Sequence, residues 1–188
     1  HVKDVNLSEG LDGLSLSDHT CAHHHEGKDL HFWLDPIIAL QQSKKIYEQL
    51  NLLLPEHQKQ FTENFKQLTM DLESLDEKIR TELTPLQGSY LLLSHPALGY
   101  YCKRYGLHQL SVECEGKEPL PQQVAKVVKE AQENHVKVIF TEPQYNNKGA
   151  VLIADKLHLP IYEINPYAGD YFKMMNEITD TIVKYYGH

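Results

Sequence analysis

The chain has 188 residues, 41% of them hydrophobic, and its formal net charge at pH 7 is −8. This length accommodates one large domain, or one and a half small ones, with a sizeable hydrophobic core. The 18 Lys and Arg residues are scattered among 26 acidic residues, which argues against nucleic-acid binding because phosphate recognition needs a clustered basic surface. No apolar run approaches the roughly 18 to 20 residues needed to cross a bilayer, so no transmembrane segment is expected.

The first residues give little regular pattern. The chain starts at His1 with neither an initiator methionine nor a signal peptide, and we expect it to be a processed or excised piece. Residues 2–7 are a candidate strand. The Gly, Ser, Asp and His-rich stretch that follows, up to residue 30, has no periodicity and is typical of a surface loop.

Two helices are expected next. Proline at a first helical position predicts a helix from Pro36 to Leu53, which Pro55 ends. Over residues 56–83, apolar side chains recur three and four positions apart, which predicts a second amphipathic helix. This helix would be about 40 Å long, longer than one small domain needs.

After residue 85, short apolar runs alternate with helical segments, which is typical of a parallel α/β sheet. The expected strands are 89–93, 108–112, 137–140 and 161–164, and the expected helices are 97–105, 121–134, 149–157 and 171–186. The predicted fold class is therefore α/β, with a parallel sheet of about four strands flanked by helices and preceded by a long linking helix.

Three polar residues fall at predicted strand ends: His95, Glu142 and Asn165. In open α/β sheets, ligands bind outside the carboxyl ends of the strands. We therefore expect these three side chains to meet at one edge of the sheet.

Histidines His31 and His95 are candidate metal ligands, since neutral imidazole is the commonest ligand for zinc. Taken alone, each is more readily explained as a structural hydrogen-bonding residue, and His95 could cap the helix that follows it. Both lie in proline-containing turns, and His31 follows a histidine-dense loop, which favours a shared site. From the residues alone, both explanations stay open.

The loop before His31 carries four histidines: His19, His23, His24 and His25. A solvated polar segment is the plain explanation, but clustered imidazoles also collect zinc, nickel or copper weakly at neutral pH, and we favour that auxiliary role. Glu142 either orients a ligand imidazole or is simply a strand-end residue.

Catalytic motifs are missing. The sequence contains no GxSxG elbow, phosphate-cradling glycine loop or HExxH helix. An enzyme would have to be a metallohydrolase with His31 and His95 as ligands and Glu142 as general base. We expect no enzyme, and keep this hydrolase as the second hypothesis from the residues.

The three cysteines are not arranged as CxxC, which argues against a thiolate zinc cage or a redox motif. A disulfide between Cys102 and Cys114 would leave Cys21 over, and it requires an oxidising compartment. The sequence leaves this pairing open.

Several strings together resemble the zinc-binding solute-binding proteins of metal-uptake ABC transporters, a group that includes manganese-binding members and some described as adhesins. They are the histidine loop followed by HFWLDP, the long helix, SHPALGYY, EPLPQQVAKVVKEAQENHVKVIFTEPQ and NPYAGDYFKMMNEI. The resemblance covers essentially the whole chain. It implies two α/β lobes bridged by a rigid helix, with the metal ion in the cleft between them.

By this resemblance the chain divides into the tail of an N-terminal lobe with its histidine loop (1–35), a helix with the long linking helix (36–84), and a C-terminal α/β lobe (85–188). The family's earliest histidine lies upstream of any residue here. We therefore expect an incomplete metal site that binds zinc more weakly than the complete protein.

The resemblance also assigns ligands. His31 would be the ligand that follows the N-terminal loop, and His95 the first ligand of the C-terminal lobe. Asn165 stands where the family usually has aspartate and is a neutral, poorer ligand. The site would then be three histidines with water or another carboxylate, and Glu163 on the same strand face is a candidate substitute. Manganese-selecting relatives have glutamate at the position of His95. Since nitrogen ligands favour Zn²⁺ and hard oxygen ligands suit Mn²⁺, the histidine implies Zn²⁺.

The implied function is capture of Zn²⁺ outside the cytoplasm, in the periplasm or at the cell surface, and its delivery to a membrane ABC permease for high-affinity uptake. We expect a monomer that makes or breaks no bond. The alternative is a metal-binding surface adhesin.

Overall fold

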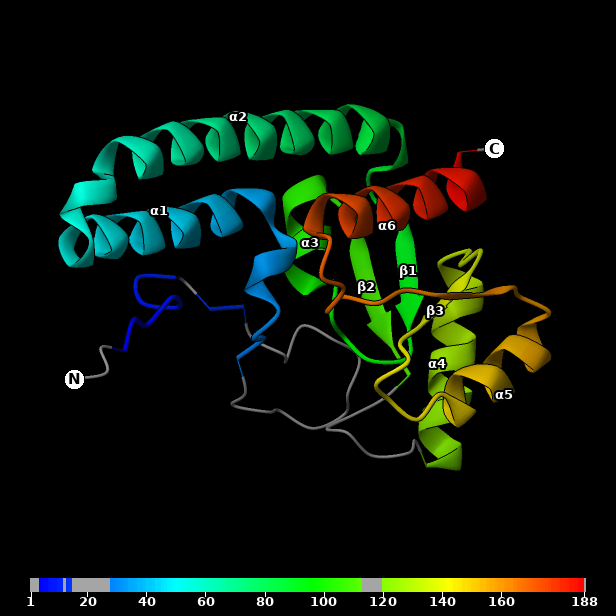
Figure 1. Cartoon of the computed structure of the whole chain (residues 1–188). Coiled ribbons are helices and arrows are strands. Elements are labelled where there is room, and N and C mark those ends of the chain that lie inside the picture. The colour runs from blue at the N-terminus through cyan, green and yellow to red at the C-terminus, as the bar shows by residue number, and fades with distance from the viewer. Residues whose placement is uncertain (1–3, 12, 15–27, 113–119, 188) are drawn as a thin grey trace.

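The computed structural model of the chain describes residues 4–11, 13–14, 28–112 and 120–187. A long pair of helices extends from an α/β unit (Figure 1). The helices are α1 (Pro36–Leu53), α2 (Gln58–Leu83), α3 (Gly99–Tyr105), α4 (Pro121–Glu133), α5 (Lys148–Leu157) and α6 (Tyr171–Tyr186). The strands are β1 (Tyr90–Leu93), β2 (His108–Ser111), β3 (Ile139–Thr141) and β4 (Ile161–Glu163).

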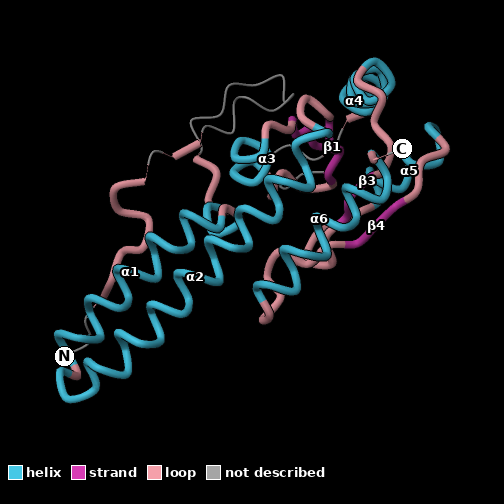
Figure 2. Tube along the Cα trace, turned by 90° about the horizontal axis from the view of Figure 1, so that it is seen from above, coloured by secondary structure: helices cyan, strands magenta, loops and turns pink. Residues whose placement is uncertain are grey.

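The helical pair confirms the two helices expected from the sequence. Asp35 caps α1, since its side chain accepts hydrogen bonds from the backbone N–H groups of Ile37 and Ile38, and Pro36 is the first helical residue. The chain reverses in a short 3₁₀ turn at Pro55–His57. Helix α2 has 26 residues, about 39 Å at 1.5 Å per residue. Figure 2 shows α1 and α2 side by side, projecting away from the sheet.

The sheet has the order β2-β1-β3-β4, and its neighbouring strands pair in parallel. The predicted four-strand parallel sheet is therefore confirmed. From β1 the chain moves outward on one side to form β2. It then crosses back past β1 and forms β3 and β4 on the other side, so the direction in which strands are added reverses between β1 and β3. In such sheets a ligand crevice opens at this switch point, outside the carboxyl ends of the strands.

Helices cover both faces of the sheet. Leu91, Leu93 and Phe140 pack with α2, α3 and α6 in one core. Leu92 and Ile139 point to the other face and pack with α4 and α5 in a second core. Adjacent strand residues thus alternate between two buried faces, which explains the nearly continuous apolar runs of these strands.

The strand expected at residues 2–7 is wrong for its described part. Residues 4–6 have no regular structure, and a turn follows at residues 7–10. The Asn6 side-chain oxygen accepts hydrogen bonds from the backbone N–H and the hydroxyl of Ser8. Such a local side-chain bond favours a turn over a strand.

The start of one helix differs from the expectation. Helix α3 begins at Gly99 rather than Ala97, because Ala97 donates its backbone N–H to the carbonyl of His95 in a tight turn. Cys102 on α3 is a buried free thiol, while Cys21 and Cys114 lie outside the described residues. None of the helices in the described ranges combines the length and apolar character that crossing a bilayer requires.

Candidate metal centre

The three polar residues expected at strand ends lie at the carboxyl edge of the sheet. His95 follows β1, Glu142 follows β3 and Asn165 follows β4 by two positions. His95 and Glu142 therefore flank the switch point between β1 and β3. The four histidines of the preceding loop, His19, His23, His24 and His25, lie outside the described residues.

His31 and His95 come together although 64 positions separate them. Their ring centroids are 5.3 Å apart, with the ring planes at 76°. Two imidazoles bound to one tetrahedral zinc ion at 2.0–2.1 Å have centroids roughly 5 Å apart. The spacing of this pair is thus already suited to sharing an ion.

Asp29 fixes the orientation of His31. Its Oδ1 accepts hydrogen bonds from the backbone N–H and from Nδ1 of His31, each at 2.8 Å. A carboxylate only accepts, so Nδ1 carries the ring proton and Nε2 presents its lone pair. Metal-bound histidines commonly donate their other ring N–H to a carboxylate in this way.

The Asp29 side chain is fully buried, and its second oxygen, Oδ2, has no hydrogen-bond partner within the described ranges. A buried carboxylate is costly unless a positive charge or further donors compensate it. A divalent cation on Nε2 of His31 would supply that compensation through the ring. The residues present therefore fit a bound Zn²⁺.

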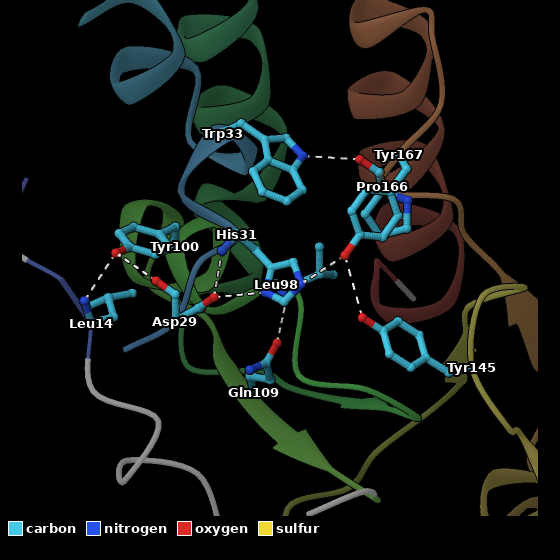
Figure 3. A network of polar contacts seen from close by, with 10 residues as sticks. All are labelled: Leu14, Asp29, His31, Trp33, Leu98, Tyr100, Gln109, Tyr145, Pro166 and Tyr167. Atoms are coloured by element: carbon cyan, nitrogen blue, oxygen red, sulfur yellow. Dashed lines mark hydrogen bonds and ion pairs between the residues drawn. The ribbon is translucent and has the colours of Figure 1, made fainter. Parts of the chain in front are cut away.

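Aromatic rings contact both histidines, and Figure 3 shows Trp33 and Tyr167 beside His31. The ring of Tyr145 stacks on that of His95, with centroids 3.8 Å apart. Trp33 lies against His31 at 5.4 Å, and Tyr167 lies against both His31 and Trp33. Neither the support that Asp29 gives to His31 nor the contacts of these three rings was expected from the sequence. Only the Asp-x-His spacing of Asp29 and His31 gave a local signal.

Asn165 serves the loop that carries Tyr167. Its Oδ1 accepts hydrogen bonds from the side-chain amide of Gln144, at 2.6 Å, and from the backbone N–H of Tyr167, at 3.1 Å. Asn165 and Glu163 are both exposed. Glu142, by contrast, is only 1% exposed.

In the parts of the chain that the structure describes, no group of three or more His, Cys, Asp and Glu side chains is placed to hold a metal ion. The described centre is therefore a pair of imidazoles with one supporting carboxylate. Neutral imidazoles suit zinc, copper and nickel, whereas manganese prefers oxygen ligands.

Comparison with protein families gives one match over nearly the whole chain. The family described as "Zinc-uptake complex component A periplasmic" matches residues 1–185. The high-affinity zinc uptake system protein ZnuA of Bacillus subtilis (strain 168) is 29% identical over 182 residues, which cover 90% of this chain and 56% of that protein. The chain thus spans just over half the length of this curated relative.

Comparison with solved structures finds similar folds. A crystal structure of ZnuA superposes with a TM-score of 0.88 at 25% identity, over 96% of this chain and 68% of that one. The laminin-binding protein Lmb of Streptococcus agalactiae, described as bifunctional with adhesin and metal transporting activity, gives a TM-score of 0.81 at 23% identity, over 95% of this chain and 69% of that one. At this identity the second likeness shows the fold alone.

Proposed function

Since the chain belongs to the family of periplasmic A components of zinc-uptake complexes, we propose that it captures Zn²⁺ outside the cytoplasm and delivers it to a membrane ABC permease. The observation that carries this proposal is the facing pair of His31 and His95. Their two rings come from separate segments, and the buried carboxylate of Asp29 orients the ring of His31.

A carrier must bind its ion tightly and still release it. Closed structural zinc sites have four protein ligands, whereas sites that exchange a ligand keep an open position. Two imidazoles at an open sheet edge leave positions for water or for further ligands. This arrangement supports reversible capture rather than a structural zinc ion.

We propose His31 and His95 as ligands, and Asn165 or Glu163 as an oxygen ligand that joins them after a local rearrangement. Burial of Glu142 suits an orienting role better than direct binding. The loop histidines His19, His23, His24 and His25 would collect ions near the site.

The donor set supports Zn²⁺ over Mn²⁺ as the cargo, because nitrogen ligands favour the softer ion. We further propose a location in the periplasm or at the cell surface, and a monomer without enzymatic activity. Only a similarity of fold supports the adhesin alternative. The described residues give no support to a hydrolytic role of the site.

Isothermal titration calorimetry of the chain with ZnCl₂ and MnCl₂ tests the proposal. We expect Zn²⁺ to bind more tightly than Mn²⁺, and His31→Ala and His95→Ala each to weaken Zn²⁺ binding at least about tenfold, since each loses a metal–nitrogen bond. The matched control is His108→Ala, at the start of β2 on the opposite edge of the sheet. Unchanged zinc affinity in either site variant would contradict the proposal.

A further inference from the structure

The nitrogen of His31 that faces the candidate centre already has a contact. The hydroxyl of Tyr167 lies 3.3 Å from Nε2 of His31. Because Nδ1 donates to Asp29, Nε2 is the acceptor, and the tyrosine hydroxyl is the donor. One imidazole lone pair either accepts a proton donor or bonds a metal ion, but it does not do both.

Tyr167 is held in this position by neighbours on three segments. Its backbone N–H donates to Asn165, and the preceding carbonyl of Pro166 accepts the indole N–H of Trp33 at 3.1 Å. Its hydroxyl is also 3.5 Å from the hydroxyl of Tyr145. Figure 3 shows the Tyr167 hydroxyl between His31 and Tyr145.

Tyr167 is nevertheless 48% exposed. Its outer side faces solvent, so rotation of the side chain away from His31 does not require the core to open. The contact with Nε2 is also longer than the usual optimum for a hydrogen bond. A hydroxyl in this position is therefore displaceable.

We propose that Tyr167 sets the zinc affinity and entry rate of the site, by occupying Nε2 of His31 with its hydroxyl until an incoming Zn²⁺ displaces it. The O–H···Nε2 hydrogen bond breaks, the Nε2–Zn bond forms, and the phenolic proton stays on the tyrosine. This inference rests on the proposed function, since it assigns a competitor to the same nitrogen that would bind the ion.

The test is zinc binding by Tyr167→Phe, which keeps the ring against Trp33 and His31 but removes the hydroxyl. A net hydrogen bond of ordinary strength corresponds to a change of about two- to tenfold in affinity. Because this contact is long, we expect Zn²⁺ to bind about two- to fivefold more tightly, with faster association. Tyr47→Phe is the matched control, because its hydroxyl meets Thr62 on the helical pair.

Affinity is measured by calorimetry with ZnCl₂, and association by stopped-flow fluorescence. Trp33 is the single tryptophan of the chain and touches both rings concerned, so its emission reports events at the site. Thermal unfolding without metal verifies that both variants fold like the unmodified chain.

Two results would overturn the inference while leaving the proposed function intact. If the unmodified chain binds Zn²⁺ through His31, but Tyr167→Phe binds with the same affinity and rate, the hydroxyl does not compete. If Tyr167→Phe binds more weakly, the hydroxyl assists the ion instead of opposing it. Failure of the unmodified chain to bind Zn²⁺, or equal binding by His31→Ala, would refute both proposals.

Discussion

The two residues Asp29 and His31 form the most constrained part of the candidate centre. One carboxylate oxygen binds both the backbone N–H and the ring N–H of the same histidine, so the direction of the ring and the position of its proton are fixed together. The rotamer entropy that a free histidine would lose on binding an ion is already lost here.

We predict that Asp29→Asn weakens zinc binding about 10- to 100-fold, as is typical when a carboxylate that supports a ligand histidine is removed. The amide lacks the negative charge, and it makes an acceptor for Nδ1–H only in one of its two orientations. Competition with a zinc chelator measures the affinity. Asp71→Asn, an exposed site on α2, is the control for loss of one charge.

The Asp29→Asn variant also distinguishes a role in positioning His31 from a role in stabilising the fold. If Asp29→Asn lowers the unfolding temperature without metal but leaves zinc affinity unchanged, then Asp29 is a structural residue only. Equal zinc affinities for Asp29→Asn and the unmodified chain would contradict its supporting role.

At position 165 we predict that Asn165→Asp strengthens binding of Zn²⁺, and that of Mn²⁺ by a larger factor. The aspartate retains an oxygen for the bonds from Gln144 and Tyr167, and it adds a negative charge and a hard donor. Paired titrations with the two metals measure the effect. If neither affinity changes, and Glu163→Ala weakens Zn²⁺ binding, then Glu163 rather than position 165 supplies the oxygen.

At the scale of elements, an ion-pair cluster joins the helical pair to the α/β unit. Arg104 on α3 contacts Asp35, which caps α1, and Asp76 on α2. The hydroxyl of Tyr105 donates to Asp76 at 3.0 Å, and burial, together with the charge of Asp76, raises the pKa of Tyr105. The cluster therefore ties three helices together near the entry to α1.

We predict that Arg104→Met lowers the free energy of unfolding by about 2–4 kcal/mol, because Asp35 and Asp76 lose a shared cation in a largely buried place. Urea unfolding measures this change. Lys103→Met, at the exposed neighbouring position on α3, should change the free energy of unfolding by less than about 0.5 kcal/mol. A similarly small effect of Arg104→Met would show that the cluster contributes little.

Helices and strands were predictable from the sequence where the pattern of their own residues determines the secondary structure. The three-and-four spacing of apolar residues gave α2, and the apolar runs bounded by turns gave β1 and β3, since packing demands that periodicity. The candidate strand at residues 2–7 was wrong because one side chain, Asn6, forms a local turn.

The site was predictable in part. His31 and His95 could be singled out as candidate ligands, because residue type carries much of that signal. The parts played by Tyr145 and Tyr167 depend on tertiary neighbours, because their rings meet His95 and His31 only after β1, β3 and β4 align at their carboxyl ends. No local pattern encodes such contacts.

For the molecule as a whole, the reversal of strand order between β1 and β3 explains where the centre lies. His95 comes from the loop that follows β1, whereas His31 comes from the segment that leads into the helical pair. The site therefore joins two parts of the fold, so a change in their relative position would alter the distance between the two ligands. This arrangement suits binding and release of an ion.

The central claim is that His31 and His95 bind the same Zn²⁺ ion, and crystals of the chain grown with ZnCl₂ test it most directly. We predict that an anomalous difference map at the zinc absorption edge has a peak about 2.0–2.1 Å from Nε2 of His31 and from a ring nitrogen of His95, with the Tyr167 hydroxyl moved away. A peak bonded to neither histidine, or to only one of them, would contradict the claim.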